Sequence, residues 1–183
     1  MILCGLGGQG ILYMTKVLAQ TALENGFNIM GAETHGMAQR GGSVVSHLRI
    51  GEVEGSLVIN GSAHFLLSLD PTEAYRNLPL LAPRAKIYVN TDPALFPKSE
   101  IKEYLLKKEI GYHSFEAHLI ANKLGAPMSS NLSLLGYFSA FEEGPFNHNE
   151  LSATIERIGP SRFKKSNLDV FNIGFERGCK ERS

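Results

Sequence analysis

Apolar residues follow two alternating patterns along this chain. In short segments they form compact runs or occupy every second position, as in residues 43–50. In longer segments they recur every three to four positions, as in residues 11–25. The first pattern is typical of strands and the second of helices packed against a sheet. We predict strands at residues 1–5, 27–32, 43–50, 65–69, 86–90 and 112–114, and helices at 11–25, 72–78, from 100, and at 115–124, 130–142, 149–158 and 166–179.

The alternation of strands and helices defines the expected fold class. It predicts an α/β, Rossmann-like fold with a mostly parallel sheet and helices on both faces. The chain has 183 residues, with no internal repeat and no low-complexity linker. We therefore expect a single domain over residues 1–183, long enough to bury about 70% of its unfolded surface.

Composition and charge exclude several kinds of partner. Lys plus Arg number 18 and Asp plus Glu number 18, so the net charge is zero. A broad basic face for nucleic acid or for a membrane surface is therefore not expected. No apolar run reaches the ~18 residues of a membrane span and no signal peptide pattern is present, so we expect a cytoplasmic protein. A neutral surface does little to keep copies apart, which permits a homodimer of the isolated chain.

The first motif with chemical meaning is GLGGQG at positions 5–10, between a predicted strand and a predicted helix. Gly5 permits a tight turn, Gly7 lets backbone N–H groups approach a phosphate, and Gly10 lets the helix pack closely on the strand. Gly8 and Gln9 complete the loop, and the helix start adds positive dipole charge. The loop is thus a candidate phosphate site, and a tight turn without a ligand is the alternative.

A nicotinamide dinucleotide is one ligand that such a loop could hold. That site needs an acidic residue about 20 residues further on, at the end of the second strand. Glu33 lies 23 residues after Gly10 and meets this requirement. However, a second polar, glycine-rich loop follows at once, and no substrate domain or catalytic pair is evident. A stand-alone NAD(P)-binding oxidoreductase is therefore the less favoured hypothesis.

The second motif begins at Glu33 and crowds polar residues among three glycines. In a parallel sheet, loops after adjacent strands lie at the same edge, so we expect this loop to lie beside the first. The Arg40 guanidinium could bind a phosphate or carboxylate, or could instead pair with Glu33. The candidate pocket residues of this motif are Glu33, Thr34, His35, Arg40, Gly41 and Gly42.

Together, GLGGQG and ETHGMAQRGGSVVSHLRIG at positions 33–51 make the chain recognisable. It resembles the gamma subunit of the 2-oxoacid:ferredoxin oxidoreductases, called the beta subunit in indolepyruvate:ferredoxin oxidoreductase. Later landmarks match in order and extend the resemblance over nearly the whole chain: Leu69-Asp70, Val89-Asn90-Thr91, NLSLLG at 131–136 and the ending at 171–178.

The resemblance implies a subunit, inactive alone, of an enzyme that converts a 2-oxoacid and coenzyme A to acyl-CoA and carbon dioxide. Coenzyme A would be a co-substrate, its pyrophosphate held by Gly5, Gly7, Gly8, Gln9 and Gly10. Thiamine diphosphate, Mg and iron–sulfur clusters would belong to partners. These are the alpha and beta type, thiamine diphosphate-binding subunits and a ferredoxin-type iron–sulfur subunit, and ferredoxin would accept the electrons. A purely structural partner subunit is the other alternative.

The sequence suggests no catalytic role for several other polar residues and cysteines. Asn131 is a candidate pocket residue, and a plain N-cap of the next helix is its alternative. Cys4 lies in a predicted core strand, where thiols are usually inert. With Cys179, it makes only two cysteines, too few for an iron–sulfur cluster. The six histidines have no metal-ligand spacing, and we expect no resident metal or cofactor on this chain.

Overall fold

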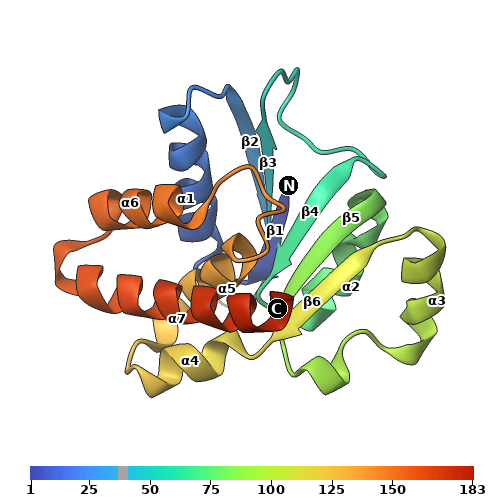
Figure 1. Ribbon diagram of the computed structural model, residues 1–183. Helices are drawn as coiled ribbons and strands as arrows, with labels where there is room; N and C mark the ends of the chain where they lie inside the picture. Colours follow the sequence, from blue (N-terminus) through green and yellow to red (C-terminus); the bar gives the residue numbers. More distant parts are fainter. Residues whose placement is uncertain (37–40) are drawn as a thin grey trace.

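A six-stranded sheet forms the centre of the molecule, and its strands are β1 (Ile2–Leu6), β2 (Ile29–His35), β3 (Ser43–Ile50), β4 (Ala63–Ser68), β5 (Leu81–Asn90) and β6 (Gly111–Phe115). The computed structural model describes residues 1–36 and 41–183, without the side chain of His35. The strand order is β2-β3-β1-β4-β5-β6 (Figure 1). β1, β4, β5 and β6 pair in parallel, so the predicted mostly parallel sheet is confirmed.

Helices cover both faces of this sheet, as the sequence predicted. They are α1 (Ile11–Glu24), α2 (Pro71–Asn77), α3 (Ser99–Lys107), α4 (Ala117–Lys123), α5 (Ser130–Ser139), α6 (His148–Ile158) and α7 (Lys164–Arg182). Period-two alternation within β1 explains the two layers. Leu3 joins a core with α1, α5, α6 and α7, whereas Ile2 and Cys4 join a core on the opposite face with α2 and α3. Figure 1 shows α2 and α3 apart from the other helices.

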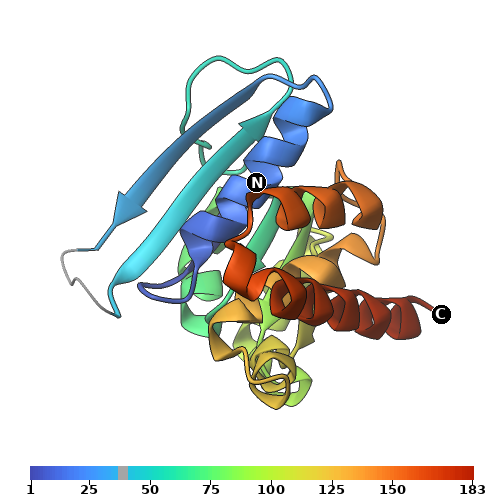
Figure 2. The same cartoon turned by 90° about the vertical axis from the view of Figure 1, so that its left-hand side faces the viewer.

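The third strand differs from the expected arrangement. β3 is antiparallel to both of its neighbours, β1 and β2, and it separates them. The prediction that the first two strands are adjacent is therefore wrong. β2 and β3 form a long hairpin, and β2 is an edge strand of the sheet (Figure 2). Because β3 reverses direction, β2 still runs parallel to β1, and both strands end at the same edge.

The two helices α5 and α7 cross with their backbones almost in contact. A Cβ built on Gly136 would lie 2.0 Å from the Phe171 carbonyl oxygen, and one built on Gly174 would lie 2.1 Å from the Ser133 carbonyl oxygen. No side chain fits between the helices at these two points. The crossing fixes α5, which begins beside the end of the glycine loop.

Candidate functional site

The glycine loop is a tight turn held by its own glutamine. The Gln9 N–H donates to the Leu6 carbonyl at 3.1 Å, and Gln9 Oε1 accepts from the Leu6 N–H at 2.6 Å. Gln9 Nε2 also donates to the Leu69 carbonyl at 3.4 Å. A Cβ on Gly5 would lie 2.6 Å from Gln9 Oε1, so glycine is needed there to admit this side chain. Gln9 therefore acts within the loop, through contacts that its sequence position alone did not reveal.

Only part of the loop has backbone donors available for a ligand. Gly5 lies inside β1, and the Gly7 N–H donates to the Gly42 carbonyl at 2.8 Å. Gly8 (φ 99°) and Gly10 (φ 82°) take left-handed conformations that favour glycine, and neither N–H donates to any described residue. The N–H groups of Gly8 and Gly10 are therefore the donors of this loop that have no acceptor among the described residues.

The start of α1 adds to this electropositive character. Its N-cap is Gly10, which offers no side-chain cap, and its first turn holds no acidic residue. The first N–H groups of a helix lack intrahelical acceptors, and the dipole places about half a positive charge there. The arrangement can stabilise a phosphate or carboxylate by hydrogen bonds and by charge.

The first part of the second motif lies on a strand rather than in a loop. β2 continues to His35, with Glu33 opposite Ser46, Thr34 opposite Val45 and His35 opposite Val44. The prediction that the strand ends at residue 32 is therefore wrong. Glu33 and Thr34 are exposed, so these positions carry no apolar alternation that could have extended the predicted strand.

The two glycine-rich segments meet at the edge of the sheet, as expected. The Gly7 N–H donates to Gly42, and the Gly41 N–H donates to the Gly7 carbonyl at 3.4 Å. The Gly36 N–H donates to the Ser43 carbonyl at 2.7 Å and closes the base of the second segment. Arg40 and the His35 side chain lie outside the described residues, so their ligand roles stay predictions, as does the Arg40–Glu33 ion pair.

A buried carboxylate anchors the second segment to the body of the protein. Glu73, on α2, is 1% exposed and accepts a hydrogen bond from the Ser43 hydroxyl at 2.6 Å. Its other oxygen pairs with Arg76 on the same helix. Sequence reasoning missed this residue, because the contact joins positions 30 apart and leaves no local pattern.

Asn131 links the glycine loop to α5. It is 2% exposed, and its Nδ2 donates to the Gly10 carbonyl at 2.9 Å. The helix begins one residue earlier with Ser129 as its N-cap, so the plain N-cap alternative for Asn131 is wrong. A Cβ on Gly10 would lie 2.6 Å from Asn131 Nδ2, which gives a packing reason for glycine at that position.

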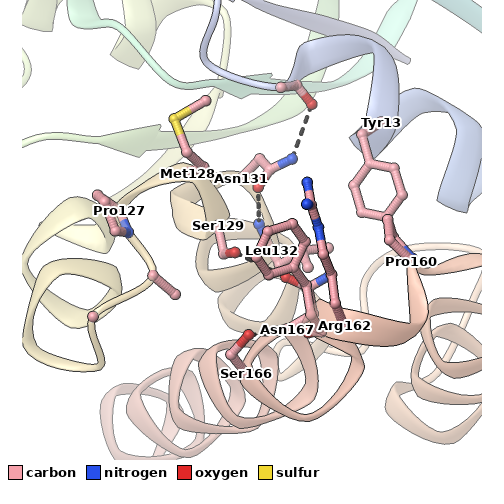
Figure 3. A pocket seen from close by; sticks show the side chains of 14 residues that line it. Tyr13, Pro127, Met128, Ser129, Asn131, Leu132, Pro160, Arg162, Ser166 and Asn167 are labelled. Atoms are coloured by element: carbon pink, nitrogen blue, oxygen red, sulfur yellow. Dashed lines mark hydrogen bonds between the residues drawn. The ribbon is translucent and has the colours of Figure 1, made fainter.

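Beside Gly10 and Asn131 lies a cavity of about 510 Å³. Three segments line it: the start of α1 with Tyr13, the turn 125–129 that leads into α5, and residues 160–167 at the start of α7. Figure 3 shows the Arg162 side chain rising into this cavity between Asn131 and Tyr13. Its volume is in the range of small-molecule sites, about 300–1,000 Å³. The sequence reasoning identified Gly10 and Asn131 but missed the rest of the lining.

Cys4 and His47, which lie away from this edge, are packed or hydrogen-bonded within the protein. Cys4 is fully buried, and burial raises the pKa of its thiol to about 12, which confirms an inert core cysteine. His47 accepts a hydrogen bond from the Val58 N–H through Nδ1, and burial lowers its pKa. In the described part of the chain, no three His, Cys, Asp or Glu side chains gather as a metal ion would need.

The fold and this edge define a class: an α/β module whose glycine loop can receive a phosphate. The sequence profile of the pyruvate ferredoxin/flavodoxin oxidoreductase family matches residues 1–177. The chain belongs to this family. It is 35% identical over 183 aligned residues to the indolepyruvate oxidoreductase subunit IorB of Methanothermobacter thermautotrophicus, with 94% of this chain and 93% of that protein covered.

Solved structures show the same fold. The keto/oxoacid ferredoxin oxidoreductase gamma subunit of Geobacter sulfurreducens matches with a TM-score of 0.76 and 20% identity, covering 98% of this chain and 97% of that one. A 2-oxoglutarate:ferredoxin oxidoreductase from Magnetococcus marinus, solved with 2-oxoglutarate, coenzyme A and succinyl-CoA bound, matches with a TM-score of 0.74 and 17% identity. There the match covers 99% of this chain and 30% of the longer one. The relatives are thus subunits or longer chains of oxidoreductases.

None of the helices in the described ranges combines the length and hydropathy that a membrane span requires.

Proposed function

We propose that residues 1–183 form one gamma-type domain that helps a 2-oxoacid:ferredoxin oxidoreductase bind coenzyme A. The complex would oxidatively decarboxylate a 2-oxoacid to acyl-CoA in the cytoplasm. Its alpha and beta type subunits would carry thiamine diphosphate and Mg, an iron–sulfur subunit would carry the clusters, and ferredoxin would accept the electrons. Because the described residues of the site include no paired acid and base, this chain would contribute binding and assembly, and the partners the chemistry.

One observation carries the coenzyme A role: the N–H groups of Gly8 and Gly10 have no acceptor among the described residues and lie beside an uncapped helix start. A pyrophosphate is an anion with several acceptor oxygens, and such oxygens suit this set of donors. The neighbouring cavity could receive a further part of a long ligand. A structural relative was solved with coenzyme A bound, which supports the choice of this ligand.

The geometry does not fit the dinucleotide alternative equally well. A dinucleotide site places its acidic residue on the strand next to β1. Here β3 occupies that position, and Glu33 lies one strand further away, at roughly twice the ~4.8 Å spacing between neighbouring strands. Calorimetric titration of the isolated chain with NAD(P)H tests this directly. Binding at micromolar Kd would favour the dinucleotide function over ours.

The coenzyme A role can be tested in the complex reconstituted with its thiamine diphosphate-binding subunits. The variant is Gly8→Ala, because Gly8 is exposed and its added Cβ would meet no atom of the described residues within 4 Å, apart from its chain neighbours. The methyl group would instead stand where a phosphate approaches and would strain the left-handed backbone. We expect the KM for coenzyme A to rise by about tenfold or more, equivalent to about 1.4 kcal/mol, with the 2-oxoacid KM unchanged.

Gly51→Ala is the matched control, since Gly51 also has a positive φ of 104° and open space around its Cβ position. It should leave both KM values unchanged. If Gly8→Ala assembles normally and leaves the coenzyme A KM unchanged, the chain acts as a structural partner. A change in only the 2-oxoacid KM would indicate that the loop contributes to the 2-oxoacid site and not to the coenzyme A site.

A further inference from the structure

Glu73 places a carboxylate inside the protein, beside the start of β3. It is 1% exposed, and burying a charge is costly unless partners compensate it. Two described partners do so: the Ser43 hydroxyl donates to Oε2 at 2.6 Å, and the Arg76 guanidinium pairs with Oε1. Arg76 belongs to the same helix, and its side chain is 63% exposed. The contact that reaches another part of the fold is therefore the one to Ser43.

The backbone that carries this carboxylate is held in place at the start of α2. Asp70 caps the helix, and its Oδ1 accepts hydrogen bonds from the N–H groups of Thr72 and Glu73 at 2.8 and 3.1 Å. Asn77 Nδ2 donates to the Glu73 carbonyl at 2.9 Å. The next residue, Ala74, is fully buried in the core between α2 and the sheet. The carboxylate thus projects from a fixed support.

Ser43 lies where the β1–β3 pairing passes into the two glycine-rich segments. It is the first residue of β3 and lies opposite Leu6, the last residue of β1. One residue further, the Gly7 N–H donates to the Gly42 carbonyl at 2.8 Å, and the Gly41 N–H donates to the Gly7 carbonyl at 3.4 Å. Figure 2 shows this end of the β2–β3 hairpin extending away from the helices. The hydrogen bond of the Ser43 hydroxyl ties it to the body of the protein.

We infer that Glu73 is a positioning residue for the glycine loop and acts through the Ser43 hydroxyl. The inference rests on the proposed function, which assigns the N–H groups of Gly8 and Gly10 to the pyrophosphate of coenzyme A. The two hydrogen bonds at Gly7 fix the backbone that leads into Gly8. The direction of the ligand-binding N–H groups therefore depends on where the segment that begins β3 lies. Glu73 is buried behind this segment and acts on the ligand only through it.

The test measures both Michaelis constants in the reconstituted complex, at a temperature at which circular dichroism shows every variant to be folded. Ser43→Ala and Glu73→Ala each remove one partner of the hydrogen bond. We expect the KM for coenzyme A to rise by about threefold to tenfold in both variants, as the loss of an ordinary hydrogen bond would give. The kcat and the 2-oxoacid KM should stay unchanged, because neither the partners nor their chemistry is altered.

A conservative variant separates the hydrogen bond from the charge. Glu73→Gln keeps a side-chain oxygen that can accept from the Ser43 hydroxyl, and the exposed Arg76 side chain can turn toward solvent. The KM for coenzyme A should therefore stay close to that of the wild type. A KM as high as in Glu73→Ala would overturn the inference, because the acceptor for Ser43 would then not be what matters.

Tyr88→Phe is the matched control for a loss of stability. The Tyr88 hydroxyl donates to Glu143 Oε2 at 2.7 Å, which is also a hydroxyl–carboxylate hydrogen bond but joins β5 to the segment after α5. Its removal should lower the free energy of unfolding and leave the KM for coenzyme A unchanged. If Tyr88→Phe raises this KM as much as Ser43→Ala does, Glu73 has only a general structural role and the inference is overturned.

Amide hydrogen exchange of the complex gives a readout that needs no coenzyme A. The exchange of the Gly7 N–H should be about threefold to tenfold faster in Ser43→Ala, because its acceptor Gly42 is held less firmly. Tyr88→Phe should leave it unchanged.

The combined outcomes distinguish this inference from the proposed function. If Gly8→Ala raises the KM for coenzyme A and Ser43→Ala does not, the inference is overturned and the proposed function survives, whatever the exchange of Gly7 shows. If Gly8→Ala leaves that KM unchanged, the proposed function fails. Faster exchange of Gly7 in Ser43→Ala would then still support the positioning of the loop by Glu73, and unchanged exchange would overturn it.

Discussion

The contact between α5 and α7 makes a quantitative prediction for the substitution Gly174→Ala. The added Cβ would lie 2.1 Å from the Ser133 carbonyl oxygen, and separations under 3.0 Å are essentially never observed for real Cβ atoms. The clash is with backbone, so no rotamer change relieves it. The two helices must therefore separate by about 1 Å where they are most tightly packed.

The expected free-energy change has two opposing parts. Overpacking in a rigid site costs about 3 kcal/mol, at the upper end of the usual range. Alanine gains about 1 kcal/mol over glycine in a helix. The net loss is about 2 kcal/mol. With an urea m value of about 2 kcal/mol/M for a chain of this size, the unfolding midpoint should fall by about 1 M.

Urea unfolding followed by circular dichroism measures this shift. Asp169→Ala, an exposed substitution on the same helix, is the control for helix propensity and should not lower the midpoint. The double variant Gly136→Ala/Gly174→Ala should lose less stability than the sum of the single changes, because the first separation relieves the second clash. If Gly174→Ala is as stable as the wild type, or is stabilised like the control, the described helix contact is wrong.

Three other predictions follow from the buried groups. Iodoacetamide should alkylate Cys179 but not the buried Cys4 in the folded protein, and mass spectrometry would show which cysteine is labelled. The reason is that the thiolate is the nucleophile, and burial raises the pKa of Cys4 to about 12. Labelling of Cys4 in the folded protein would contradict this prediction. The pKa of His47 is lower in the folded protein than its usual value of 6.5 in the unfolded chain. As the pH falls below about 6.5, His47 is therefore protonated more readily in the unfolded chain, and the folded state loses stability. The Tm of the wild type should therefore fall more than that of His47→Gln between about pH 7.5 and 5.5, and equal or smaller falls would refute the assignment. Glu73→Ala and Ser43→Ala should each lower the free energy of unfolding by about 1–3 kcal/mol, because each removes one partner of the Ser43–Glu73 hydrogen bond. The double variant should lose less than the sum of the two single losses, whereas strict additivity would show that this hydrogen bond contributes nothing.

The sequence predicted most elements of the fold because their patterns are local. Residues 43–50 alternate in polarity and form β3 with the expected bounds. The strand direction was not predictable, since a parallel and an antiparallel strand share the same alternation. The end of β2 was missed for a different reason. Glu33 and Thr34 are both exposed, so the sequence there lacks the alternation of apolar and polar residues that predicts a strand.

The candidate site was likewise predicted in part from local sequence patterns. The glycine loop was found because Gly5, Gly7 and Gly10 follow a known spacing rule between a strand and a helix. Glu73 and Arg162 were not found, because their importance depends on contacts between segments distant in the chain. Before the fold is known, Arg162 is one basic residue among many between two helices. Its interest comes from the cavity it enters and from the lack of a carboxylate partner among the described residues.

The position of β2 at the edge of the sheet has a practical consequence for handling this protein. An edge strand carries a row of backbone N–H and C=O groups without partners, and these can add strands from other chains and start aggregation. β2 offers little protection, since Glu33 is the only acidic or basic residue in IMGAETH apart from a histidine, and Met30 and Gly31 are exposed. A Lys in place of Thr34 would add the kind of charge that natural edge strands use against self-association.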